Sequence, residues 1–143
     1  MTSIYKVYDA FLSKMLEDEW LNWTDEEIQQ DWRALLNAAI PRFKFPRVDI
    51  NIDEEEQAFI GDLDIDEIEI LACFMKCEWL NREILTWENI KPLYVERDFS
   101  QANLIDKMVK LLANEKKNAA SLERIYYRSR KRKPFDYTRL AGE

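Results

Sequence analysis

Apolar side chains recur at helical spacing in four stretches of the chain, and this periodicity predicts a mainly α-helical protein. The first stretch covers residues 3–21, with the apolar positions Ile4, Val7, Tyr8, Phe11, Leu12, Met15 and Leu16. The second begins at Thr24, which has the spacing of a capping box with Glu27. It is expected to end near Ile40, because Pro41 disfavours helix at the residue before it. Its expected inward face is Ile28, Trp32, Leu35, Leu36 and Ala39.

Residues 42–52 follow a different pattern, in which apolar and polar side chains alternate. A period of two predicts an extended segment or a short strand pair, interrupted by Pro46. The acidic run 53–56 comes next, and together with Asp49 it could offer carboxylates to a metal ion. Since it lacks the alternating ligands and central glycine of a calcium loop, a solvated loop or a charged interface is the favoured interpretation.

Two further helices are predicted in the second half of the chain. Asp62 or Asp64 can cap the first of them, which is expected to reach Leu85. A helical turn and a loop bent by Pro92 are expected from Thr86 to Asp98. The apolar face of this first helix is Ile68, Leu71, Ala72, Met75, Trp79 and Leu80, flanked by Ile65, Cys73 and Phe74.

The last predicted helix is capped by Ser100 and starts near Gln101. Its apolar stripe is Leu104, Ile105, Met108, Leu111, Leu112, Leu122, Ile125 and Tyr126. Residues 114–121 contain almost no large apolar side chain. At about 28 residues this helix would be about 42 Å long, so its far end is expected to project or to pack on a neighbour.

After this helix the chain becomes basic and aromatic. Pro134 disfavours helix at Lys133, and apolar residues then alternate with polar ones. We therefore divide the chain into a helical domain, residues 1–129, and an extended basic and aromatic tail, residues 130–143. The candidate docking residues are Arg124, Arg128, Arg130, Lys131, Arg132, Lys133, Phe135, Tyr137, Arg139 and Leu140.

Charge separates the same two regions. The chain carries a net charge of −7, yet residues 124–143 hold seven basic and two acidic residues, a net charge of +5, which leaves −12 for residues 1–123. Such a molecule can associate head to tail, or insert its tail into a separate acidic surface.

Three interpretations of the tail remain open. It could be a docking peptide that charge steers and that Phe135, Tyr137 and Leu140 anchor in pockets. It could bind nucleic acid, with basic residues on phosphates and Tyr126, Tyr127 and the tail aromatics stacked on bases. It could also be a solvated terminus that aids solubility. The acidic body disfavours nucleic acid, because it would repel phosphate around the tail.

Residue usage narrows the chemistry. The chain has no histidine, so the commonest general base and zinc ligand are missing, and neither a metal nor another cofactor is expected. Cys73 and Cys77 lie one turn apart in a helical pattern and are interpreted as buried core thiols. No apolar run is long enough to span a membrane, and no signal peptide is recognised, so synthesis in the cytoplasm is expected.

Five tryptophans are more than one small core requires. Trp20, Trp23 and Trp87 lie near predicted helix ends. They are interpreted either as core and helix-end packing or as part of a subunit interface, where tryptophan is enriched.

Over residues 20–143 the layout resembles the head–tail connector (adaptor) proteins of tailed bacteriophages. The likeness rests on the helical hairpin Asp64–Leu85 and Ser100–Ser129, on Trp87-Glu88-Asn89-Ile90 and Arg97-Asp98-Phe99-Ser100 between its helices, and on the basic and aromatic ending Arg130–Leu140. The resemblance implies a non-enzymatic structural protein of the virion neck, made in the host cytoplasm. It implies a ring of copies, usually twelvefold, with the C-terminal segment inserted at the portal protein, the next neck protein bound on exposed loops, and DNA passing through the channel.

Two other functions stay open. One is a helical nucleic-acid-binding protein that uses its basic tail. The other is an enzyme built on paired acids such as Asp64 with Glu67, or Glu83 with Asp98. No nucleophile, metal-ligand set or glycine-rich phosphate loop accompanies these acids, so capping and surface roles explain them more simply.

Overall fold

The computed structural model describes residues 1–15, 20–90 and 98–132. Within them the chain has four helices and a small sheet, so the prediction of a mainly α-helical fold with a small β element and a long C-terminal helix is confirmed. In chain order the elements are β1 (Thr2–Ser3), α1 (Ile4–Ser13), α2 (Asp25–Ala39), the 3-10 helix η1 (Ile40–Arg42), β2 (Ile52–Asp53), β3 (Ala58–Phe59), α3 (Ile65–Ile90) and α4 (Asp98–Arg132).

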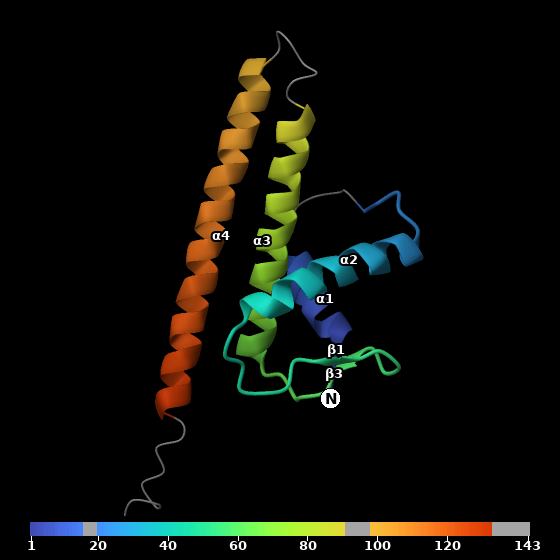
Figure 1. Cartoon of the computed structure of the whole chain (residues 1–143), viewed down its shortest axis with the longest axis vertical. Coiled ribbons are helices and arrows are strands. Elements are labelled where there is room, and N and C mark those ends of the chain that lie inside the picture. The colour runs from blue at the N-terminus through green and yellow to red at the C-terminus, as the bar shows by residue number, and fades with distance from the viewer. Residues whose placement is uncertain (16–19, 91–97, 133–143) are drawn as a thin grey trace, which may run out of the picture.

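Helix α3 is the centre of the fold, because α1, α2 and α4 all pack against it. Figure 1 shows α4 running antiparallel beside α3, while α1 and α2 lie across one half of α3. The other half of the α3–α4 pair extends beyond them. The largest fully buried side chains include Tyr8, Phe11, Leu36, Phe59, Ile70, Leu71, Met75 and Tyr126.

Helix α1 is shorter than the predicted 3–21. The hydroxyl of Ser3 caps its start by accepting from the Tyr5 N–H at 3.2 Å. At its end the N–H groups of Lys14 and Met15 donate three residues back, to Phe11 and Leu12. Such bonds tighten and close the last turn. Met15 therefore lies beyond the end of α1, and residues 16–19, with the predicted apolar position Leu16, lie outside the described chain.

The predicted capping box at the start of α2 is present, and of the two predicted caps of α3 it is Asp64 that caps the helix, in a second capping box. In α2 the Glu27 N–H donates to the Thr24 hydroxyl and the Thr24 N–H donates to Glu27. In α3 the Glu67 N–H donates to the Asp64 carboxylate at 2.9 Å, and the Asp64 N–H donates to Glu67 at 3.0 Å. The α2 helix ends at Ala39, followed by a 3-10 turn that contains Pro41, as the proline predicted.

The prediction of a strand pair within residues 42–52 is wrong except at its last residue. The strands pair antiparallel in the order β1-β3-β2, so the N-terminus supplies one neighbour of β3. The acidic run 53–56 forms the turn between β2 and β3, where the Asp53 carboxylate accepts from the Glu55 and Glu56 N–H groups. Pairing with residues this distant in sequence cannot be read from a local alternation.

The segment before β2 is a loop with bends at Phe45, Arg47 and Val48. The Gly61 N–H donates to the Asp49 carbonyl at 2.8 Å, and the Ile60 N–H donates to the Asn51 carbonyl at 2.9 Å. A Cβ atom at Gly61 would lie 2.7 Å from that Asp49 oxygen, so glycine is needed for the close approach. Phe43 is buried in the core, which explains part of the alternation.

Helices α3 and α4 are both longer than predicted. Helix α3 continues to Ile90, so the helical turn expected after Leu85 is part of α3 rather than a separate element, and the loop expected at Pro92 lies outside the described residues. Helix α4 starts at Asp98, which places Ser100 inside it rather than at its cap. Its 35 residues correspond to about 52 Å.

Three of the five tryptophans belong to one aromatic cluster. Edge-to-face contacts join Trp20 to Phe11 and Trp32, and Trp20 also lies 6.4 Å from Trp79. The Trp20 Nε1–H donates to Asp31 at 2.8 Å, and Asp31 also accepts from Arg82 of α3. Core packing therefore accounts for these three rings, whereas Trp23 is 36% exposed and stays a candidate for an interface.

Tyr8 completes the cluster, and its hydroxyl is buried with no hydrogen-bond partner among the described residues. Burial raises its pKa to about 12 from an ordinary value of 10.0. Between these two pH values the unfolded tyrosine loses its proton and the folded one keeps it. The free energy of unfolding should therefore fall there by about 1.4 kcal/mol per pH unit from this group.

We expect Tyr8→Phe to remove that alkaline loss and to change stability at neutral pH by less than about 1 kcal/mol, because the lost hydroxyl made no bond. Urea unfolding at pH 7 and at pH 11 would measure both effects. Tyr5→Phe is the matched control, since Tyr5 is 46% exposed and touches the same ring. A cost well above 1 kcal/mol at neutral pH would contradict the unpaired hydroxyl.

Candidate functional site

The predicted docking residues divide between the end of α4 and the segment after it. Helix α4 runs to Arg132, so Arg130, Lys131 and Arg132 are helical, and the predicted extended tail does not begin at residue 130. Lys133, Phe135, Tyr137, Arg139 and Leu140 lie outside the described residues. The helix ends just before the residue that precedes Pro134, as the proline predicted.

The end of α4 is held in the fold by Tyr126, which is fully buried. Its hydroxyl donates to the Glu67 carboxylate at 2.9 Å and accepts from the Arg47 N–H at 2.7 Å. Glu67 is itself 1% exposed and also belongs to the α3 capping box. This contact therefore ties α4 to the start of α3 and to the loop before β2.

Arg47 closes the same junction with its side chain. Its guanidinium lies 4.0 Å from the centroid of the Tyr126 ring, donates to the Tyr126 carbonyl at 2.7 Å, and lies 4.0 Å from the Asp64 carboxylate. Burial raises the pKa of Tyr126 far above its ordinary value, and the hydrogen bond to Glu67 raises it further. The phenol is thus neutral and fixed.

This junction corrects the suggestion that Tyr126 stacks on bases, because no part of its ring is accessible. Tyr127 is half-buried, its hydroxyl donates to Glu123 at 2.9 Å, and its ring packs edge-to-face on Phe45 and Tyr126. Tyr126 therefore presents no aromatic face to a ligand, and Tyr127 is already engaged by two neighbouring rings.

The inner face of α4 follows a seven-residue repeat that packs along α3. Its members are Ile105, Met108, Leu112, Glu115, Ala119, Leu122 and Tyr126. Ala119 is 1% exposed, so the segment predicted to be bare is part of the contact, with a small side chain where the helices approach. Glu115 enters the repeat because it pairs with Lys76 of α3 at 3.1 Å.

The outer face of α4 carries two members of the predicted docking set, Arg124 and Arg128. Arg124 and Arg128 are both exposed, and together with Ser121 and Ile125 they line a depression of about 290 Å³. Arg124 donates to the Ser121 hydroxyl at 3.1 Å. Among the described ion pairs, none involves either arginine.

The same face carries three lysines that the sequence analysis did not single out. Lys107, Lys110 and Lys117 are exposed and lie in line with Arg124 and Arg128 at steps of three, four or seven residues. We call these five residues the basic stripe. The signal was present in the sequence as spacing, but it becomes visible only once the opposite face of α4 is known to pack on α3.

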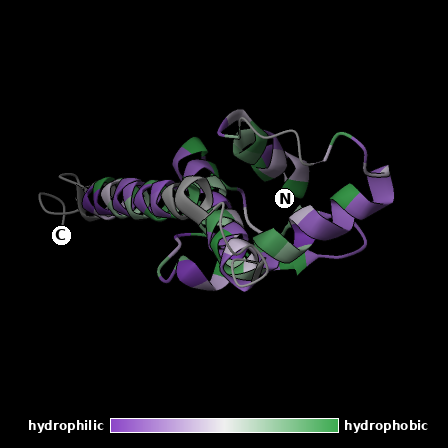
Figure 2. Ribbon diagram, turned by 90° about the horizontal axis from the view of Figure 1, so that it is seen from above, coloured by the Kyte–Doolittle hydropathy of each residue, from purple (hydrophilic) through white to green (hydrophobic). Residues whose placement is uncertain are grey.

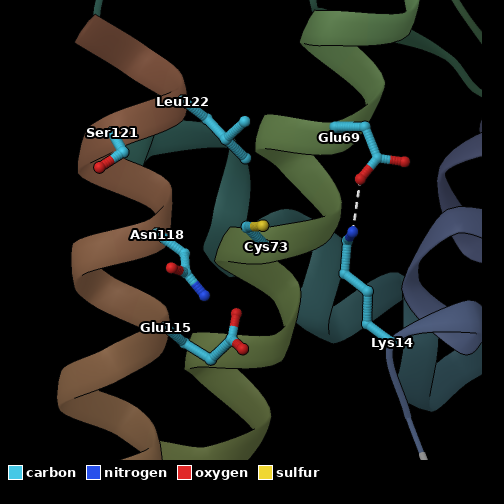
Figure 3. Close-up of a pocket in the computed structure, with 7 residues that line it drawn as sticks. All are labelled: Lys14, Glu69, Cys73, Glu115, Asn118, Ser121 and Leu122. Atoms are coloured by element: carbon cyan, nitrogen blue, oxygen red, sulfur yellow. Dashed lines mark hydrogen bonds and ion pairs between the residues drawn. The ribbon is translucent and has the colours of Figure 1, made fainter.

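A second hollow lies between α3, α4 and the end of α1. It encloses about 370 Å³ and is lined by Lys14, Glu69, Cys73, Glu115, Asn118, Ser121 and Leu122. Figure 3 shows the Lys14 ammonium directed at Glu69, with which it forms an ion pair across the hollow. The charged side chains that line the hollow are already paired, Lys14 with Glu69 and Glu115 with Lys76. They are therefore not free to bind a charged ligand.

The two cysteines are buried, as predicted, at 4% exposure for Cys73 and 1% for Cys77. Burial raises the pKa of both thiols, that of Cys77 to about 11. Both are therefore protonated at neutral pH, and a buried thiol in this form is a poor nucleophile.

Two of the four acids considered for an enzyme have other roles in the structure. Asp64 and Glu67 cap α3, and Glu67 also accepts from Tyr126. In the described parts of the chain, no three His, Cys, Asp or Glu side chains gather closely enough to hold a metal ion. Nor is any helix in those parts both long and apolar enough to cross a membrane.

Comparison with protein-family models, with curated proteins and with solved structures gives no match to this chain in any of the three.

Proposed function

We propose that the chain is a ring-forming head–tail connector of a tailed bacteriophage, which joins the portal protein to the next protein of the neck. In this proposal the protein acts by docking rather than by catalysis, and it resides in the virion neck. The observation that carries the proposal is the α3–α4 hairpin, whose outer basic face leads directly into the basic and aromatic C-terminal segment of an otherwise acidic chain.

Two features of the hairpin support a docking role. Helix α4 is anchored at Tyr126, whose hydroxyl bonds to Glu67 and Arg47 tie it to the start of α3 and to the loop before β2. Because the helix is anchored, less conformational entropy is lost when the segment attached to it binds a partner. Helix α4 continues through Arg130–Arg132 and leads into the C-terminal segment.

The experiment is a truncation after Arg132, which keeps α4 whole and removes residues 133–143. We expect the truncated protein to stay folded, because the buried network at Tyr126 lies before the cut, and to lose binding to the portal protein of the same phage. Circular dichroism measures the first result and co-purification with the portal the second. A truncated chain that enters virions as well as the full chain would overturn the proposal and leave a solvated terminus.

Charge and anchoring should separate in the same assay. Changing Arg130, Lys131, Arg132 and Lys133 to Ser should slow association with the portal and weaken its salt dependence, because such charges act mainly during encounter. Changing Phe135 and Tyr137 to Ala should speed dissociation instead. A buried aromatic anchor is worth about 2 kcal/mol, or roughly thirtyfold per site, and a ring would multiply the effect.

The nucleic-acid alternative predicts a different outcome. Both sets of substitutions would then weaken DNA binding in a gel-shift assay while portal binding remained intact. The basic stripe is the observation that keeps this alternative in view. The net negative charge of the rest of the chain counts against it, since phosphate approaching α4 also feels that field.

A further inference from the structure

The basic stripe runs along the side of α4 opposite the seven-residue repeat that packs on α3. Asn114 and Ser121 fill the remaining positions of the same line, so it contains five cations, two neutral polar side chains and no acid. From Lys107 to Arg128 the line is about 32 Å long. A stripe of this length can contact one whole side of another small folded protein.

The stripe is unbalanced within its own chain. The two acidic residues of α4 in this region point elsewhere: Glu115 pairs with Lys76, and Glu123 accepts from Tyr127. None of the five cations forms an ion pair in the part of the chain that the structure describes. Like charges three or four residues apart destabilise a helix by about 0.2–0.5 kcal/mol per pair. A face that served only solubility would mix both signs.

The complementary charge lies on the other side of the same molecule. The first turn of α2 exposes Asp25, Glu26 and Glu27, and the turn between β2 and β3 exposes residues 54–56. Figure 1 places α4 along one edge and both acidic turns at the opposite edge, and Figure 2 shows the hydrophilic free end of α2 on the side away from α4. We call residues 25–27 and 54–56 the acidic edge.

Net charge follows the same division. Residues 1–106 hold 10 basic and 24 acidic residues, a net charge of −14, and residues 107–143 hold 11 and four, a net charge of +7. Two copies placed side by side in the same orientation therefore bring opposite charges together. The same division favours a second copy over DNA, because a second copy offers an acidic surface to the stripe whereas the net charge of −14 on residues 1–106 repels phosphate.

We propose that the basic stripe of one copy docks on the acidic edge of the next. Such a head-to-tail contact is heterologous, and it closes into a ring when the rotation between copies permits. The inference deepens the proposed function, on which it rests, by giving the ring its subunit contact.

Apolar side chains beside both surfaces supply contact area once charge has aligned the copies. Leu111 and Ile125 flank the stripe and are 50% and 58% exposed. Leu21 and Trp23, just before α2, are 75% and 36% exposed. Exposed Trp and Leu next to complementary charge are typical of an interface with an apolar centre and a polar rim.

The test is a charge swap in the full chain, with assembly measured by sedimentation at several protein and salt concentrations. Reversing the stripe (Lys107→Glu, Lys110→Glu and Lys117→Glu) should weaken self-association at least tenfold. Reversing the acidic edge (Asp25→Lys, Glu26→Lys and Glu27→Lys) should do the same. Mixing the two variants should restore assembly, because each then offers the charge that the other lacks.

Lys116→Glu is the matched control, since Lys116 is an exposed lysine of the same helix outside the stripe, and it should assemble like the original chain. Restoration in the mixture also shows that both variants are folded. The inference is overturned if the original chain stays monomeric at all concentrations, if the stripe variant assembles normally, or if it loses only DNA binding. Portal binding is measured separately, so failure of the connector proposal would appear there and not in sedimentation.

Discussion

Replacing Tyr126 with Ala is expected to lower the free energy of unfolding by about 3–5 kcal/mol, the range for removing a large buried aromatic ring. The ring is completely buried, packs edge-to-face on Phe43 at 5.3 Å, and lies under the guanidinium of Arg47. Its loss would leave a cavity where α4, α3 and the loop before β2 meet. Urea unfolding followed by tryptophan fluorescence measures the change.

Tyr126→Phe separates the hydroxyl from the ring. It keeps the packing but leaves the buried Glu67 carboxylate and the Arg47 N–H each short of a partner. Unmade bonds of this kind cost about 1–3 kcal/mol. The phenylalanine variant should therefore fall between the alanine variant and the original chain.

Ile125→Ala is the control for Tyr126→Ala, because Ile125 is the preceding residue and is 58% exposed. Its effect should stay within about 0.5 kcal/mol, as is usual at surface positions. Equal effects of the two alanine substitutions would mean that the end of α4 is not packed as described. The anchoring of α4 at Tyr126, on which the docking proposal relies, would then be absent as well.

The parts of the fold that the sequence predicts well are those decided by neighbouring residues. The capping boxes at Thr24 and Asp64 each need only a hydroxyl or carboxylate and a glutamate three positions later. Pro41 and Pro134 act on the residue directly before them. In these cases the bond that fixes the structure lies within one turn of the residues that signal it.

Other features depend on partners far away in the chain. The neighbour of Ala58–Phe59 in the sheet is Thr2–Ser3, which no alternation around residue 50 could indicate. The apolar pattern of residues 3–21 continues past Ser13, but Trp20 turns its ring onto Phe11 and its N–H to Asp31 instead of extending α1. Tertiary contacts override the helical period there.

The candidate site shows the same limit. Arg124 and Arg128 were found because the tail is densely basic, whereas the lysines of the stripe are diluted among residues of the inner face. Their alignment has meaning only relative to the side of α4 that contacts α3. Tyr126 was considered for both faces from sequence, and its bonds to Glu67 and Arg47 assign it to the inner one.

Replacing Phe11 with Ala is expected to be about as destabilising as Tyr126→Ala, again about 3–5 kcal/mol. Phe11 is fully buried at the end of α1, and its ring lies 5.8 Å from that of Trp20. An edge-to-face pair adds about 0.5–1.5 kcal/mol to the burial of the rings. Truncation would remove both contributions.

The effect should concentrate at the N-terminal end of the fold. A helix of 10 residues is not stable alone in water, so α1 persists because Ile4, Val7, Tyr8 and Phe11 are buried against α3 and its neighbours. Amide hydrogen exchange should therefore accelerate in α1 and at Ile4, whose N–H donates to the Gln57 carbonyl beside the sheet, before it changes in α3.

Leu12→Ala provides the comparison, because Leu12 follows Phe11 directly in the same helix and is 37% exposed. The two substitutions change helix propensity similarly, yet only Phe11→Ala opens a cavity, so its loss of stability should be several times larger. Trp20 fluorescence reports the same event, since its ring loses its packing partner in one variant and keeps it in the other. If Leu12→Ala proved equally destabilising, α1 would have to present a different face to α3, and the aromatic cluster around Trp20 would not be what holds it.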